Sequence, residues 1–164
     1  MAHFAEIDKD NKVIRVLAAC NQDIADNGGE LSEQAAKHFE TVCPLSSNGV
    51  KWVQTSYNHN FRKKYAGIGD VYDPVKDKFL AQQPYASWSL DSSDDWQAPI
   101  TYPTVTNDGK AGTEEDPNEW VYVISWNETK YDADNTKGWE ALKSDDTSDT
   151  PTKYDWNGTA WVSA

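Results

Sequence analysis

The chain has 164 residues, a length that suits one or two small domains. Its formal net charge of −12 disfavours binding to nucleic acid or to an anionic membrane surface. No apolar run reaches the roughly 18 residues that a membrane span needs, and residues 1–10 lack the features of a secretory signal. The charge is uneven: residues 91–164 carry 16 acidic and 5 basic side chains, whereas residues 1–90 carry 11 and 10. The two halves therefore present different surfaces.

The N-terminal residues predict a β-hairpin. Apolar and polar side chains alternate over residues 2–8, and apolar side chains resume over residues 12–20. Between them, Lys9, Asp10 and Asn11 offer turn chemistry.

A helix and a third strand are predicted next. Apolar residues fall at helical spacing over residues 30–42, and Pro44 follows the end of that pattern. Residues 51–57 alternate again, which indicates a strand. We expect the helix to pack on the sheet formed by the hairpin and this strand, with Phe39 and Trp52 buried between them.

From residue 71 the pattern changes to short aromatic strands separated by polar turns. The predicted strand pairs are 71–72 with 78–80, 87–90 with 96–98, 119–126 with 139–142, and a terminal hairpin over 154–162. Residues 104–117 and 143–152 are acidic and rich in Thr, Ser, Gly and Pro, which is typical of exposed loops. Single hairpins are marginal in water, so these must pack side by side or against a partner.

The overall prediction is a β-rich α+β fold, in which an N-terminal hairpin, one helix and a sheet are followed by short aromatic β-hairpins. We expect three segments: an α+β unit at 1–70, aromatic hairpins at 71–103, and an acidic insertion with a C-terminal hairpin at 104–164.

The spacing of chemically reactive residues favours neither catalysis nor cofactor binding. The three histidines, His3, His38 and His59, are scattered, and Cys20 and Cys43 fit no zinc signature. We expect no catalytic residue, no cofactor and no metal site. Asp108 with Gly109 and the oxygen-rich residues 131–135 leave weak calcium binding as an alternative, although residues 131–135 lack the Gly and distal Glu of an EF-hand.

The aromatic and basic side chains supply the candidate partner-binding residues. Eight Trp are more than a chain with 38% hydrophobic residues easily shields in its own interior. Arg62, Lys63 and Lys64 form the one concentrated cationic patch, which could dock an acidic neighbour or simply be a solvated loop. The candidates are Arg62, Lys63, Lys64, Trp88, Trp96, Trp156 and Trp161. The tryptophans could instead stack on carbohydrate, but packing is the favoured interpretation.

Residues 1–103 carry an ordered series of motifs. They are AHFAEID, NKVIRV, WVQTSYN, NFRKKYAGIG followed by YD, PYASWSL and WQAPITYP. This series resembles a family of small proteins of tailed bacteriophages, common in phages of cyanobacteria and other marine bacteria. The resemblance implies a virion or virion-associated protein without catalytic residues. Beyond residue 103 the chain departs from the family pattern, so residues 104–150 look like an insertion.

The resemblance and the composition together favour a non-enzymatic structural protein of the phage particle. A capsid decoration or cement protein is the first choice, because a small, acidic, aromatic-rich chain suits many copies clamped across capsid subunits. A tail, neck or fibre-associated protein and a carbohydrate-binding adhesin module are the alternatives, and a cell-wall hydrolase is the least favoured. The expected partners are the major capsid protein or tail subunits, with copies of itself as a further candidate and host glycan as a less favoured one. We expect no nucleic-acid or membrane partner, and a protein made in the cytoplasm of the host bacterium that ends in the virion.

Overall fold

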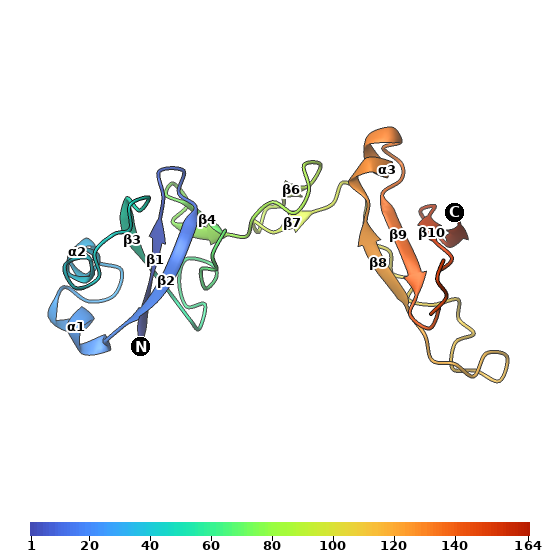
Figure 1. Ribbon diagram of the computed structural model, residues 1–164, viewed down its shortest axis with the longest axis horizontal. Helices are drawn as coiled ribbons and strands as arrows, with labels where there is room; N and C mark the ends of the chain where they lie inside the picture. Colours follow the sequence, from blue (N-terminus) through green and yellow to red (C-terminus); the bar gives the residue numbers. More distant parts are fainter. The chain divides into compact units, whose positions relative to one another are not determined.

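A computed structural model describes residues 1–164 and has a β-rich α+β fold, as predicted. The chain forms two compact units (Figure 1). Unit 1 contains Met1–Gln83 and Ser92–Asp95, and unit 2 contains Pro84–Asp91 and Trp96–Ala164. The three predicted segments do not coincide with these units, because residues 71–83 belong to unit 1 and residues 96–103 to unit 2.

Unit 1 is built on a three-stranded antiparallel sheet with the order β2-β1-β3. Its central strand β1 (Ala2–Ile7) pairs with β2 (Val13–Ala19) in the predicted hairpin and with β3 (Lys51–Thr55) on its other edge. Because side chains alternate along a strand, Phe4 faces one side of the sheet while Ala5 and Ile7 face the other. All three are fully buried, so the sheet is covered on both faces.

The first face is covered by two helices, α1 (Asn21–Asp26) and α2 (Glu33–Val42) (Figure 1). Helix α2 begins after Ser32, whose Oγ accepts a hydrogen bond from the Ala35 N–H at 2.9 Å. Its Phe39 stacks on Phe4 at 4.6 Å between ring centroids and meets Trp52 edge-on at 5.0 Å. The predicted packing of Phe39 and Trp52 is therefore confirmed, whereas α1 was not predicted.

The second face is covered by the predicted hairpin of β4 (Val71–Asp73) and β5 (Lys78–Leu80). Tyr72 and Phe79 pack there with Ala5, Ile7 and Val13. The Val13 N–H donates to the Asp70 carbonyl at 2.8 Å, which ties the hairpin to β2.

Unit 2 contains a four-stranded antiparallel sheet with the order β11-β10-β9-β8. Its strands are β8 (Tyr122–Trp126), β9 (Trp139–Lys143), β10 (Tyr154–Trp156) and β11 (Trp161–Ser163), and a separate ladder joins β6 (Ser89–Leu90) to β7 (Trp96–Gln97). The segment interpreted as an insertion thus supplies β8 and β9, one edge strand and its neighbour in this sheet.

Helix α3 (Glu128–Ala133) connects β8 to β9 and was not predicted. Asn127 caps it, because its side-chain oxygen accepts from the Lys130 N–H at 3.1 Å. None of the three helices has the length and apolar content that crossing a membrane requires.

The interior of unit 2 consists mainly of indole rings. Trp126, Trp139 and Trp156 are buried, and the rings of Trp126 and Trp139 meet edge-on at 5.0 Å. Their polar tips are satisfied: the Trp126 N–H donates to the Glu128 carboxylate at 2.7 Å and the Trp139 N–H to the Ile100 carbonyl at 2.9 Å. Gly138 leaves room for the Trp126 ring, which a Cβ at that position would strike.

Candidate functional site

The basic cluster predicted from sequence is ion-paired within unit 1. The pairs are Arg62 with Asp77 at 2.6 Å, Lys63 with Asp95 at 2.7 Å and Lys64 with Asp70 at 2.7 Å. Arg62 also donates to the Gln54 carbonyl at 2.7 Å, and only 13% of its side chain is exposed. An acidic neighbour would have to displace these internal partners, so the three residues do not form a free cationic patch.

Two further lysines of unit 1 hold a buried aspartate. The Asp94 carboxylate accepts from Lys78 at 2.8 Å and from Lys76. The hydrogen bonds from these two ammonium groups lower the pKa of Asp94 to about 2. The residues Ser92–Asp95 are therefore held to unit 1 by charge.

A cluster of aromatic rings lies at the surface of unit 1. His3 stacks on Tyr57 at 5.8 Å and meets Tyr65 edge-on at 5.3 Å, and the two tyrosine rings are 5.5 Å apart. Tyr57 is 66% exposed, and the Nδ1 atom of His3 has no hydrogen-bond partner in the chain. Burial and the nearby N-terminal ammonium lower the pKa of His3.

Sequence reasoning did not single out this cluster, although the three residues stand in the AHFAEID, WVQTSYN and NFRKKYAGIG motifs. The pairing of His3 with Thr55 across β1 and β3 brings His3 close to Tyr57. A register for the predicted sheet would therefore have revealed part of it.

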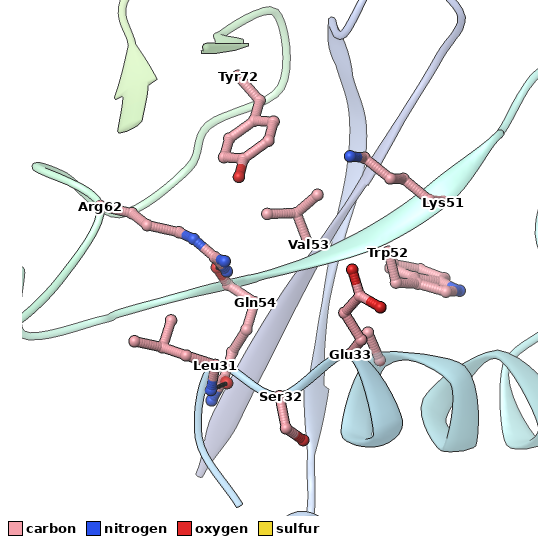
Figure 2. A pocket seen from close by; sticks show the side chains of 10 residues that line it. Leu31, Ser32, Glu33, Lys51, Trp52, Val53, Gln54, Arg62 and Tyr72 are labelled. Carbon is pink, nitrogen blue, oxygen red and sulfur yellow. Dashed lines mark hydrogen bonds between the residues drawn. The ribbon is translucent and has the colours of Figure 1, made fainter. Parts of the chain in front are cut away.

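A small cavity of about 140 Å³ lies in unit 1 between the start of α2 and β3 (Figure 2). Lys51 and Arg62 reach toward the Tyr72 ring, with Lys51 Nζ 5.3 Å and the Arg62 guanidinium carbon 5.7 Å from its centroid. Burial and the hydrogen bond to Asp77 raise the pKa of Tyr72 to about 12. Small-molecule sites usually measure about 300–1,000 Å³, so this cavity suits ordered water better than an organic ligand.

The four tryptophans proposed as partner-binding residues differ in burial. Trp156 is only 9% exposed, so its ring is not available at the surface of unit 2. Trp88, Trp96 and Trp161 are half-buried, and Trp161 donates its N–H to the Val105 carbonyl at 2.9 Å. A role of these three at an interface stays a prediction.

Two open grooves lie in unit 2. The first, of about 530 Å³, is lined by residues 96–102 with Trp88 and Trp139. The second, of about 560 Å³, is lined by residues 104–109 with Tyr122 and Trp161, and by Ala160. Both fall in the size range of small-molecule sites. No local pattern in the sequence predicted these grooves, because each one combines a loop with strands that are distant along the chain.

The acidic residues do not assemble into a metal site. No group of three or more His, Cys, Asp or Glu side chains is placed to hold a metal ion. In the segment considered for calcium, the Asp134 carboxylate instead accepts hydrogen bonds from the Thr136 N–H at 3.0 Å and hydroxyl at 2.7 Å. These bonds lower the pKa of Asp134 and stabilise a local turn.

Comparison with family models, curated proteins and solved structures finds no match to this chain.

Proposed function

We propose that this chain is a non-enzymatic structural protein of a tailed-phage particle. Capsid decoration is the favoured place, and a tail, neck or fibre position is the alternative. The proposal starts from the ordered motifs of residues 1–103, and the contacts that those motif residues make in unit 1 support it.

The observation that carries the proposal is that polar groups of motif residues are engaged in contacts within unit 1. The Trp52 N–H donates to the Cys43 carbonyl at 2.9 Å, and the Gln54 side-chain oxygen accepts from the Leu31 N–H at 2.6 Å. The Asp70 carboxylate accepts from the Gly67 N–H at 2.7 Å and pairs with Lys64. A motif whose polar groups are engaged in this way maintains an architecture, which is what a particle subunit requires.

The aromatic cluster of His3, Tyr57 and Tyr65 is the surface that we assign to a neighbouring subunit. These motif residues contribute little to the buried core, and Tyr57 presents most of its side chain to solvent. Tyrosine is enriched at interface hot spots, where truncation commonly costs about 2 kcal/mol or more of binding free energy. The partner that fits is a capsid or tail subunit with an apolar pocket for this ring.

The first experiment asks whether the protein is a particle component. Particles of the phage that encodes the chain are purified by density gradient, separated into heads and tails, and measured by quantitative mass spectrometry. We expect many copies per particle in the head fraction. Recovery in tails would favour the alternative position, and abundance in infected cells with absence from purified particles would refute the proposal.

The second experiment tests the docking surface. Tyr57→Ala should reduce incorporation into particles strongly while leaving folding intact, because the side chain is 66% exposed. Val75→Ala is the matched control, since Val75 is 93% exposed and lies outside the cluster. Equal incorporation of both variants would show that another surface makes the contact.

Hydrolysis of cell-wall material by the purified protein, abolished by changing one carboxylate, would contradict the proposal that the protein is not an enzyme.

A further inference from the structure

The second groove of unit 2 combines aromatic rings with unused hydrogen-bonding groups. The ring centroids of Trp161 and Tyr122 are 5.1 Å apart, and their planes are tilted by 39°. The Trp161 ring is held in place by its hydrogen bond to the Val105 carbonyl and by packing against Trp156 at 5.2 Å. It is nevertheless only partly buried and lines the groove. A ring fixed before a ligand arrives loses little conformational entropy on binding.

The loop of residues 104–109 adds polar groups to the same groove. Asn107 uses its side-chain oxygen to accept from the Gly109 N–H at 2.8 Å, which leaves its amide N–H groups free to donate. One carboxylate oxygen of Asp108 accepts a hydrogen bond from the Lys110 N–H at 2.9 Å, which leaves the second oxygen able to accept another. Thr104 and Thr106 line the same groove and add two hydroxyl groups to it. Donors and acceptors therefore surround the aromatic faces.

The charge of the groove restricts the ligand. Its lining includes one carboxylate and no Lys, Arg or His. Residues 91–164 as a whole carry 16 acidic and 5 basic side chains, so phosphate, sulfate and acidic sugars are repelled. A neutral molecule with one apolar face and a rim of hydroxyl groups matches both the rings and the polar loop. That description is a neutral sugar.

We propose that the groove formed by residues 104–109, Tyr122 and Trp161 binds a neutral carbohydrate, with one sugar ring stacked on Trp161. Asn107 donates to a sugar hydroxyl and Asp108 accepts from one. The cavity of about 560 Å³ accommodates one or two sugar rings. The first groove is the less suitable one, because its Gln97 amide already donates to Asp91 at 3.2 Å. This binding is independent of where the protein sits in a particle.

The test uses the purified full-length chain and a glycan array of neutral and acidic oligosaccharides. Each neutral glycan that binds is then titrated while tryptophan fluorescence is recorded. We expect weak but saturable binding. The double variant Asn107→Ala with Asp108→Asn should weaken it roughly ten-fold or more, because two hydrogen bonds to the sugar are lost. Both side chains lie in a surface loop, so folding should survive, and circular dichroism checks this. Trp161→Ala should abolish binding.

Tyr102→Ala is the matched control, because Tyr102 is 57% exposed and lines the first groove instead. It should bind the same glycans as the unmodified protein. Absence of neutral-glycan binding at millimolar concentrations would overturn the proposal, as would binding of acidic glycans alone. Loss of binding in Tyr102→Ala with full binding by the Asn107 and Asp108 double variant would also overturn it, since the sugar would then occupy the first groove.

Discussion

The two units have interiors of different chemistry. Unit 1 buries aliphatic and aromatic side chains on both faces of its sheet, together with one fully buried carboxylate, Glu6. That carboxylate pairs with Arg15 and accepts a hydrogen bond from the Ser46 N–H at 2.5 Å. The interior of unit 2 consists mainly of indole rings, with Trp126, Trp139 and Trp156 at its centre.

A low content of aliphatic side chains therefore does not by itself place aromatic rings at the surface. An indole ring buries a large apolar area, but its N–H needs an acceptor. In unit 2, the Glu128 carboxylate accepts from the Trp126 N–H, the Ile100 carbonyl from the Trp139 N–H and the Val105 carbonyl from the Trp161 N–H. Five of the eight tryptophans are buried, whereas Trp88, Trp96 and Trp161 are half-buried, so the chain does not fully shield all eight.

Removing a central indole should cause the largest loss. Trp126→Ala is expected to lower the free energy of unfolding of unit 2 by about 3–5 kcal/mol, because it leaves a cavity among rings that cannot collapse. Hydrogen exchange should accelerate in β8 and β9 and stay unchanged in β1. Val123→Ala, on the same strand but 56% exposed, should change stability by less than about 0.5 kcal/mol. Equal acceleration in both units would show that the two interiors do not unfold separately.

Adding one methyl group tests each interior in turn. A Cβ at Gly138 would strike the Trp126 ring, and a Cβ at Gly49 would strike the Glu6 carboxylate. Each alanine variant should lose about 1–3 kcal/mol of unfolding free energy, with faster exchange confined to its own unit. Gly67→Ala is the control, because its nearest neighbour is at an ordinary 3.5 Å. A neutral Gly138→Ala variant would mean that the indole core is loosely packed.

Acid should lower the stability of unit 1 by less than the core substitutions do. Burial alone would raise the pKa of Glu6, but hydrogen bonds from Arg15 and Ser46 outweigh it and lower that pKa, while Lys76 and Lys78 lower the pKa of Asp94 to about 2. A lowered pKa in the folded state means that the stabilisation is present above the unfolded value and lost as pH falls. We expect unit 1 to lose stability between about pH 4 and pH 2.

Asp94→Asn separates the two contributions. The variant should be less stable than the unmodified protein at pH 7, and its stability should fall less steeply below about pH 4. Urea unfolding at a series of pH values measures this. An unchanged pH profile would show that the two lysines do not hold Asp94 in solution.

The smallest effect is expected for an ion-pair network on unit 2. Lys130 contacts Asp155 and lies 3.2 Å from Glu140, and its side chain is 29% exposed. Lys130→Met should cost at most about 1 kcal/mol, since partly exposed ion pairs contribute little. Lys137→Met, which removes a 3.8 Å contact to Asp134, should have no measurable effect. A loss for Lys130→Met above about 5 kcal/mol, the upper value expected for Trp126→Ala, would show that charge stabilises unit 2 more than an indole ring does.

The elements with a clear period were predictable, and those without one were not. The opening hairpin, α2, and the pairing of β8 with β9 follow from alternation or helical spacing. Helices α1 and α3 span only six residues each, too few for a periodic pattern to emerge. Helix α3 is capped by the Asn127 side chain, whereas α1 has no side-chain cap and buries only Ile24.

The ion pairs of the basic cluster could not be predicted from the sequence either. Arg62, Lys63 and Lys64 stand together in the sequence, which favoured a free basic patch. Their partners Asp77, Asp95 and Asp70 lie elsewhere along the chain, and no local pattern marks them. Pairing between distant residues can be recognised only once the strands are placed in register.

The position of β1 at the centre of its sheet has a kinetic consequence. During synthesis this strand emerges before both of its partners, and β3 follows only after two helices have been made. Until then one edge of β1 has unpaired backbone groups, which can pair with another chain. Closing the β1–β3 contact is a long-range step and therefore a slow one. Helix α2, whose Phe39 packs on Phe4, is synthesised before β3. It can cover the apolar face of the β1–β2 hairpin until β3 has been made.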